Sequence, residues 1–197
     1  MTIAKKILTA LVLFAPFPAH GSDSFALCRT LFQQGQYAMA VSSCTEAAEK
    51  GNLDAQLWLG LIYTKGKGVP QDYARALKWK KMAAMQGDPT AEFTYGRMFE
   101  QGLGVRQDYQ EALKWYKKAV AKGNAEARYS LGSLYSKGHG VKKDPVRAYA
   151  WYMLAADQGM YLAEEARDRL KQRMSAEQLV QAQKLAEQLR VSGNQEQ

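Results

Sequence analysis

The chain has 197 residues, a formal net charge of +8 at pH 7 and 47% hydrophobic residues, which suffices for one domain with a hydrophobic core. After residue 18 no apolar run is long enough to span a bilayer, which argues against membrane insertion. The lysines are spread along the sequence, so we interpret them as a solvated surface, with a basic surface facing an anionic partner as the lesser alternative.

The first 21 residues have the pattern of a secretory signal peptide. Lys5 and Lys6 form a charged start, residues 7–18 form a short apolar run, and Ala19-His20-Gly21 offers small residues for cleavage. We therefore expect an exported protein located in the bacterial periplasm, with an extracellular location as the alternative. Nucleic acid is not an expected partner outside the cytoplasm.

Residues 22–52 are predicted to form an N-terminal capping hairpin of two helices. The predicted turn lies at Gly35-Gln36, and Cys28 and Cys44 lie symmetrically on either side of it. Antiparallel helices would bring the two cysteines to a similar height. Since an exported chain meets an oxidising environment, we predict a disulfide between Cys28 and Cys44, with two reduced core cysteines as the alternative.

The chain then repeats itself three times without a gap, at a spacing of 36 residues. The predicted units are 53–88, 89–124 and 125–160. They share glycines, one aspartate, one tryptophan and small alanines, as in "LGLIYTKGKGVPQDYARALKWKKMAAMQG", "YGRMFEQGLGVRQDYQEALKWYKKAVAKG" and "LGSLYSKGHGVKKDPVRAYAWYMLAADQG". Such repetition indicates a solenoid, in which each unit buries its surface against its neighbours.

Each unit is predicted to contain two helices joined by a glycine-rich turn. In the first unit Gly66 ends the first helix, because glycine tolerates a left-handed backbone. Asp72 is the predicted N-cap of the second helix, and the equivalent Asp144 supports this because it precedes a proline. In the second unit Asp108 and Glu111 are spaced as a capping-box-like pair.

Four tryptophans invite different interpretations. Three of them recur with the repeat and are predicted to be core residues: Trp79, Trp115 and Trp151. Trp58 instead occupies the position of Thr94 and Ser130 in the later units, so the repeat does not require it. It either packs against the first hairpin or serves as a binding anchor in a groove.

Residues 161–191 are predicted to form two amphipathic C-terminal capping helices. Ser175 and Gln178 have the spacing of a capping box at the start of the second one. Polar ends of this kind stop a solenoid from polymerising, and we expect a monomer. Residues 192–197 are predicted to be a disordered tail.

The three units resemble the Sel-one-like repeat family, which is related to tetratricopeptide-type helical hairpins. The resemblance covers about residues 55–162 and implies an all-α fold, a right-handed α-α superhelix of stacked hairpins, with the first helices lining a concave face and the lysines of the second helices on the convex face. It also implies that the non-consensus positions of the first helices bind a protein or peptide partner. The predicted partner-binding residues are Gln56, Trp58, Leu61, Glu92, Thr94, Arg97, Arg128, Ser130 and Ser133.

The sequence offers no recognisable catalytic, cofactor or metal site. After the signal peptide its one histidine is His139, at a turn position that Lys67 and Leu103 occupy in the other units. No nucleophile-elbow, zinc-protease or phosphate-loop motif is present, and the glycine-rich turns follow helices instead of strands. We therefore expect a protein that is not an enzyme and binds neither cofactor nor metal.

These observations predict an exported, non-catalytic protein–protein interaction module acting in envelope regulation, envelope assembly or signalling. The resemblance leaves an alternative, an immunity protein that neutralises a secreted toxin. A lesser alternative is a β-lactam- or cell-wall-binding hydrolase, and a further one is a purely structural spacer.

Overall fold

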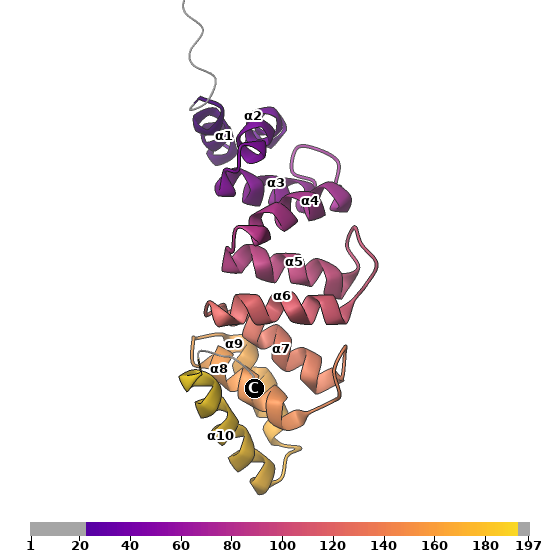
Figure 1. Cartoon of the computed structure of the whole chain (residues 1–197), viewed down its shortest axis with the longest axis vertical. Helices are drawn as coiled ribbons and strands as arrows, with labels where there is room; N and C mark the ends of the chain where they lie inside the picture. Colours follow the sequence, from indigo (N-terminus) through magenta and orange to yellow (C-terminus); the bar gives the residue numbers. More distant parts are fainter. Residues whose placement is uncertain (1–22, 193–197) are drawn as a thin grey trace, which may run out of the picture.

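The computed structural model describes residues 23–192, which contain ten α-helices and no strand (Figure 1). The all-α fold of stacked helical hairpins predicted from the sequence is therefore confirmed. The predicted signal peptide and residues 193–197 of the predicted tail lie outside the described residues. The helices are α1 (Asp23–Gln33), α2 (Tyr37–Glu49), α3 (Leu53–Lys65), α4 (Tyr73–Met85), α5 (Pro89–Gln101), α6 (Tyr109–Ala121), α7 (Ala125–Lys137), α8 (Pro145–Ala156), α9 (Tyr161–Lys171) and α10 (Ala176–Val191).

Three helix caps predicted in the repeats are formed. The Asp72 side chain accepts the backbone N–H of Arg75, and the Asp144 side chain accepts that of Arg147, so both N-caps are confirmed. Gly66 ends α3 in the left-handed region, with φ +66°. These local signals fix the length of each helix and thereby the register of the stack.

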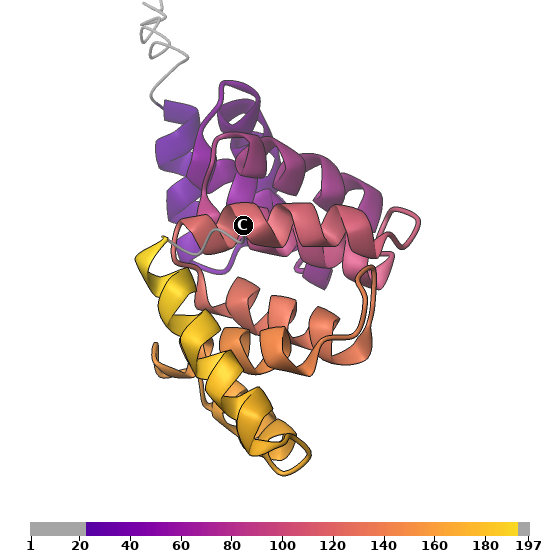
Figure 2. The same cartoon turned by 60° about the horizontal axis from the view of Figure 1, so that its bottom comes forward.

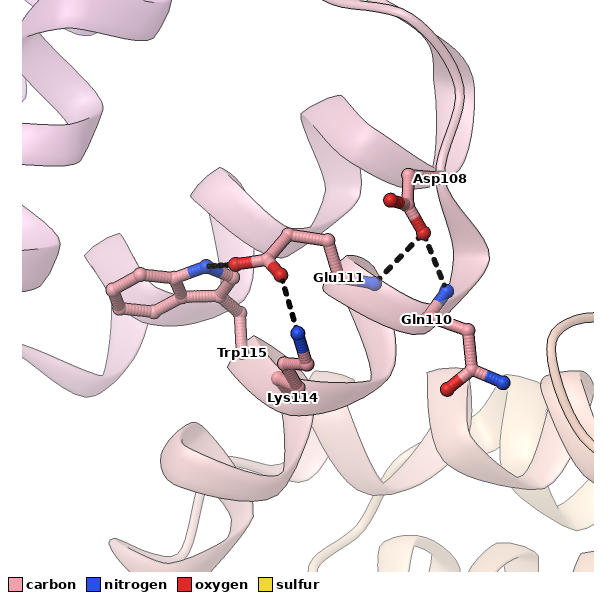
Figure 3. Close-up of polar contacts among 5 residues, drawn as sticks. All are labelled: Asp108, Gln110, Glu111, Lys114 and Trp115. Carbon is pink, nitrogen blue, oxygen red and sulfur yellow. Dashed lines mark hydrogen bonds and ion pairs between the residues drawn. The ribbon is translucent and has the colours of Figure 1, made fainter.

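The predicted capping box of α6 is only half formed (Figure 3). Asp108 Oδ1 accepts the backbone N–H groups of Gln110 and Glu111, as an N-cap should. The Glu111 carboxylate does not return to the N-cap, because it accepts the indole N–H of Trp115 at 2.9 Å and the ammonium of Lys114 at 3.0 Å. An indole N–H that is partly shielded from water needs such a partner, and it competes successfully for the carboxylate.

The three repeated tryptophans do not share one environment. Trp79 and Trp151 are buried, with 4% and 0% exposed, as predicted. Trp115 is half-buried, which corrects the prediction that it lies in the core. Its ring packs edge-to-face on Tyr95 with centroids 4.9 Å apart, and the Lys118 ammonium lies 3.9 Å from its centroid.

The glycine-rich turn of each repeat packs against the preceding helical hairpin. A Cβ on Gly68 would lie 2.7 Å from a backbone nitrogen at the start of α2, so a side chain would prevent this approach. The Lys67 ammonium lies 4.7 Å from the ring centroid of Tyr37. In the third repeat the ring of His139 packs 4.6 Å from that of Tyr109. The variable position of the turn therefore contacts a tyrosine of the preceding hairpin.

The N-terminal hairpin is closed by the predicted disulfide between Cys28 and Cys44, both of which are fully buried. Trp58 of α3 packs against this hairpin, which was one of the two interpretations of that residue. Its ring stacks on Phe32 with centroids 4.7 Å apart and on Phe25 at 5.8 Å. This stack joins α1 to the first repeat.

At the other end of the stack α10 packs on α8 (Figure 2). Ser175 and Gln178 form the complete capping box that the sequence predicts at the start of α10. Leu189 is 2% exposed and joins the core cluster of the third repeat. Arg190 makes an ion pair with Asp157 at 2.5 Å.

Candidate interaction surface

The first helices of the repeats, α3, α5 and α7, share one outward stripe. At its centre Leu61 is 36% exposed, Arg97 is exposed and the equivalent Ser133 is half-buried. Three residues earlier in each helix, Trp58, Thr94 and Ser130 are half-buried. We call this stripe the first-helix face. It consists of Trp58, Leu61, Lys65, Thr94, Arg97, Gln101, Ser130, Ser133 and Lys137.

The remaining predicted partner-binding residues turn towards the chain itself. Gln56 is 1% exposed and Glu92 is 3% exposed, while Arg128 is half-buried and donates to the backbone oxygen of Leu154 at 3.3 Å. All three lie in the first two turns of their helices, beside the end of the second helix of the same unit. They contact that end instead of the first-helix face.

In two units this contact includes a side chain from the end of the second helix. The Lys122 ammonium donates to Glu92 at 2.6 Å and to the carbonyl of Gly87 at 2.8 Å. In the first unit Gln86 makes the neutral version of the same pair, donating to Gln56 at 2.8 Å. Each pair ties the two ends of one repeat together, which is a structural task.

Second-helix side chains cross the first helices at their glycines. A Cβ on Gly96 would lie 3.0 Å from the ring of Tyr116, and one on Gly132 would lie 2.6 Å from the ring of Tyr152. These rings therefore occupy the space that a side chain on the first helix would take. Their hydroxyl groups reach polar side chains of the first helices, a contribution that the sequence-based prediction missed. The available signal was a glycine repeated in mid-helix, where glycine is otherwise unfavourable.

The two tyrosines have polar partners on the first helices. The Tyr116 hydroxyl donates to Glu100 at 2.5 Å. Burial, followed by the charge of Glu100, raises the pKa of Tyr116, while Ser130 and Arg97 oppose the shift. Burial raises the pKa of Tyr152 to about 12, opposed by hydrogen bonds with Ser133 and Ser136. Both phenols are therefore neutral at physiological pH.

Lys80 occupies the equivalent position in the first repeat. A Cβ on Gly60 would lie 2.9 Å from Lys80 Cγ, so the side chain runs along α3. Lys80 is 9% exposed, and burial, followed by the charges of Arg97 and Lys65, lowers its pKa to about 8. The crossing position of the first repeat is therefore filled by a basic side chain instead of a phenol.

The lysines predicted to lie on the opposite side of the second helices are exposed, as expected. The Lys78 ammonium lies 4.6 Å from the ring centroid of Trp79, and Lys114 pairs with Glu111 of its own helix at 3.0 Å. Such exposed pairs add little to stability. The exposed set is Lys78, Lys81, Lys114, Lys117 and Lys118.

Two classes of feature are not found between residues 23 and 192. No group of three histidine, cysteine, aspartate or glutamate side chains there is arranged to hold a metal ion. None of the described helices is long and apolar enough to cross a membrane.

Comparison with known proteins decides the family. The Sel1 repeat family matches residues 53–88, 89–124 and 125–160. The chain belongs to the Sel1 repeat family. Sel1 repeats are the Sel-one-like repeats that the sequence resembles, and they are generally protein-interaction modules. Sel1 repeat proteins are also generally non-catalytic scaffolds.

Two solved structures are similar to this Sel1 repeat chain. A Sel1 repeat protein from Oxalobacter formigenes is 35% identical, with a TM-score of 0.66, over 74% of this chain and 62% of that one. The protein c5321, a protective antigen present in uropathogenic Escherichia coli strains, has an SLR fold and is 29% identical, with a TM-score of 0.58, over 84% of this chain and 45% of that one. The present chain thus spans less than two thirds of either protein. No curated protein matches the sequence.

Proposed function

We propose that this Sel1 repeat protein is an exported, non-catalytic interaction module that binds a partner protein on its first-helix face, in envelope regulation, assembly or signalling. The proposal rests on residue identity in α3, α5 and α7, which is kept between repeats on the buried side of these helices and changes on the outward side. The buried positions repeat, as with Ala55, Ala91 and Ala127, all 0% exposed. The outward positions do not, since Leu61 is replaced by Arg97 and then by Ser133. Packing does not constrain these outward positions, so they are free to take the side chains that a partner requires.

Two observations support export to the periplasm. The Cys28–Cys44 disulfide is in keeping with an oxidising compartment. The first 21 residues have a signal-peptide pattern. A fusion of those residues to alkaline phosphatase, which is active only after export, tests this part of the proposal. Inactivity of the fusion would contradict it.

The interaction itself is tested by site-specific photo-crosslinking in living cells. A photoreactive amino acid placed at Leu61 or Arg97 should capture one protein reproducibly. The same amino acid placed at Lys81, which is exposed on α4 away from the first-helix face, is the matched control. Capture from Lys81 alone, or from neither face, would contradict binding on the first-helix face. Identification of the captured protein by mass spectrometry would assign the process.

A further inference from the structure

The outward side of two second helices carries a basic surface that the proposed partner binding does not use. On α4 the side chains opposite the buried Trp79 and Ala83 are Lys78 and Lys81, and both are exposed. The equivalent positions of α6, 36 residues further on, are again lysines, and a third lysine follows them. We call these residues the second-helix lysine surface. It consists of Lys78, Lys81, Lys114, Lys117 and Lys118, all of which are exposed.

The same outward positions hold other residue types in the remaining second helices. They are Ser42 and Thr45 in α2, and Ala150 and Met153 in α8. On α8 this side is covered by α10, which explains the apolar residues there. In contrast, α4 and α6 pack against their neighbours in the stack through their other sides (Figure 1). The lysines therefore belong to two helices and are not required by the repeat.

Acidic side chains are scarce on these two helices. Between Tyr73 and Met85 α4 contains no aspartate or glutamate, and α6 contains only Glu111. The Glu111 carboxylate accepts the Lys114 ammonium at 3.0 Å, but this pair is largely exposed on its lysine side and contributes little. Because the lysines of the surface outnumber this carboxylate, the outward side of α4 and α6 attracts anions.

Apolar groups lie beside the ammonium groups of this surface. The Lys78 ammonium lies 4.6 Å from the ring centroid of Trp79, and the Lys118 ammonium lies 3.9 Å from that of the half-buried Trp115. One turn after Lys81, Met85 is 71% exposed. Lysines next to tryptophan and other apolar side chains are typical of surfaces that lie on a membrane, where the apolar groups contact the headgroup region and the ammonium groups contact phosphates.

We propose that the second-helix lysine surface docks the protein on a bilayer of anionic phospholipids, without insertion of a helix. All of its cations are lysines, whose flexible stems and point charges suit a diffuse layer of phosphate groups. A carboxylate of a protein partner would favour the planar fork of an arginine. Lipid headgroups are mobile, so the lysines of α4 and α6 need no fixed distance between them. Docking on this side leaves the first-helix face open, and the inference does not depend on the proposed partner.

The test is co-sedimentation with lipid vesicles. It uses residues 22–197, which contain the whole described fold, because the apolar run at residues 7–18 would itself bind lipid. The protein should bind vesicles made of equal amounts of phosphatidylglycerol and phosphatidylcholine, and should not bind vesicles of phosphatidylcholine alone. Sodium chloride at about 1 M, where the Debye length is about 3 Å, should release it.

Two double variants with the same change of charge locate the binding surface. Lys81→Gln with Lys114→Gln should weaken binding to the mixed vesicles about 25-fold, because each lysine near an anionic surface contributes about five-fold. Lys65→Gln with Lys137→Gln, on the first-helix face, is the matched control and should weaken it less than about two-fold, since those lysines face away from the bilayer.

Three outcomes would overturn the inference: no binding to the mixed vesicles, equal binding to vesicles of phosphatidylcholine alone, or equal losses in the two double variants. Acetyl-hexaglutamate amide, tested in parallel, identifies the competing class of partner. If the protein bound this peptide through Lys81 and Lys114 and bound no vesicles, the surface would be assigned to an acidic protein instead. Photo-crosslinking from Leu61 or Arg97 still decides the proposed function, whichever result the vesicles give.

Discussion

The first repeat and the two later repeats fill the same position in different ways. In the later repeats a tyrosine crosses the first helix at a glycine and ends in a neutral hydroxyl with hydrogen-bonding partners. In the first repeat Lys80 crosses at Gly60 and ends in an ammonium instead of a hydroxyl. The repeat therefore provides a crossing position for a long side chain, which is a lysine in one unit and a tyrosine in the other two. Variants that exchange features between the repeats can test this comparison.

The largest effect is expected at the Glu92–Lys122 ion pair of the second repeat, whose counterpart in the first repeat is the hydrogen bond between Gln56 and Gln86. Lys122→Met should lower the free energy of unfolding by about 3 kcal/mol, because it leaves the buried Glu92 carboxylate without its counter-ion. Gln86→Met removes the corresponding amide and should cost only about 1 kcal/mol. Urea unfolding followed by circular dichroism measures both.

The double variant Glu92→Gln with Lys122→Gln rebuilds the pair that the first repeat uses, so it is the matched control. It should recover most of the stability that Lys122→Met loses. A double variant as unstable as the single one would show that the loss comes from packing of the Lys122 stem instead of charge.

The crossing glycines should differ in their tolerance of alanine. Gly132→Ala should cost about 2 kcal/mol, because the new Cβ would lie 2.6 Å from the Tyr152 ring and 3.2 Å from the backbone oxygen of Ala148. Gly60→Ala should cost less, about 1 kcal/mol, because its Cβ would meet only side-chain atoms of Lys80, the nearest being Cγ at 2.9 Å, and because alanine favours the helix. Comparing the two unfolding midpoints tests whether the first repeat has the looser crossing. Equal losses would mean that Lys80 is held as rigidly as the tyrosine ring.

Removing the buried charge should stabilise the protein. At pH 7 Lys80→Met should raise the free energy of unfolding by up to about 3 kcal/mol, because each unit by which the pKa is lowered corresponds to about 1.4 kcal/mol. Lys81→Met, at an exposed position, should change it by less than about 0.5 kcal/mol. If Lys80→Met were destabilising, the ammonium would have a favourable role inside the fold.

The stabilisation should depend on pH in a defined direction. The pKa of Lys80 is about 8 in the folded chain against 10.5 for an ordinary lysine. Below pH 8 the group is charged in both states and its burial opposes folding. Between pH 8 and 10.5 the folded protein releases the proton while the unfolded chain keeps it, so the unsubstituted protein gains stability relative to Lys80→Met. The difference between the two should therefore shrink over this interval, as measured by urea unfolding at several pH values.

Local signals account for what the sequence predicted well. The cap at Asp72, the left-handed Gly66 and the complete capping box at Ser175 each depend on residues within one turn. The Cys28–Cys44 disulfide followed from symmetry about a short turn. Repetition at a fixed spacing then extended these local assignments to the whole stack.

The candidate site was harder to predict because it depends on contacts between helices. Tyr116 and Tyr152 lie on second helices, so a rule that considers only the first helices does not anticipate their contacts with first-helix side chains. Gln56 and Glu92 lie on first helices, yet they turn towards the end of the second helix. Whether a first-helix side chain faces outward or contacts the end of the second helix changes within about one helical turn. Helical periodicity alone does not say where the neighbouring helix ends, so it cannot distinguish the two cases.

The smallest expected effect comes from the crossing tyrosine of the second repeat, which occupies the position that Lys80 has in the first repeat. Tyr116→Phe keeps the ring over Gly96 and removes only the hydroxyl that donates to Glu100. It should lower the free energy of unfolding by about 1 kcal/mol, since Glu100 is half-buried and water can replace part of the lost bond. Its sign is opposite to that expected for Lys80→Met, although the two residues occupy equivalent positions. The same urea unfolding measures this change. If Tyr116→Phe stabilised the protein, the polar ends of the crossing tyrosines would also destabilise the folded state, and Lys80 would not differ from them in this respect.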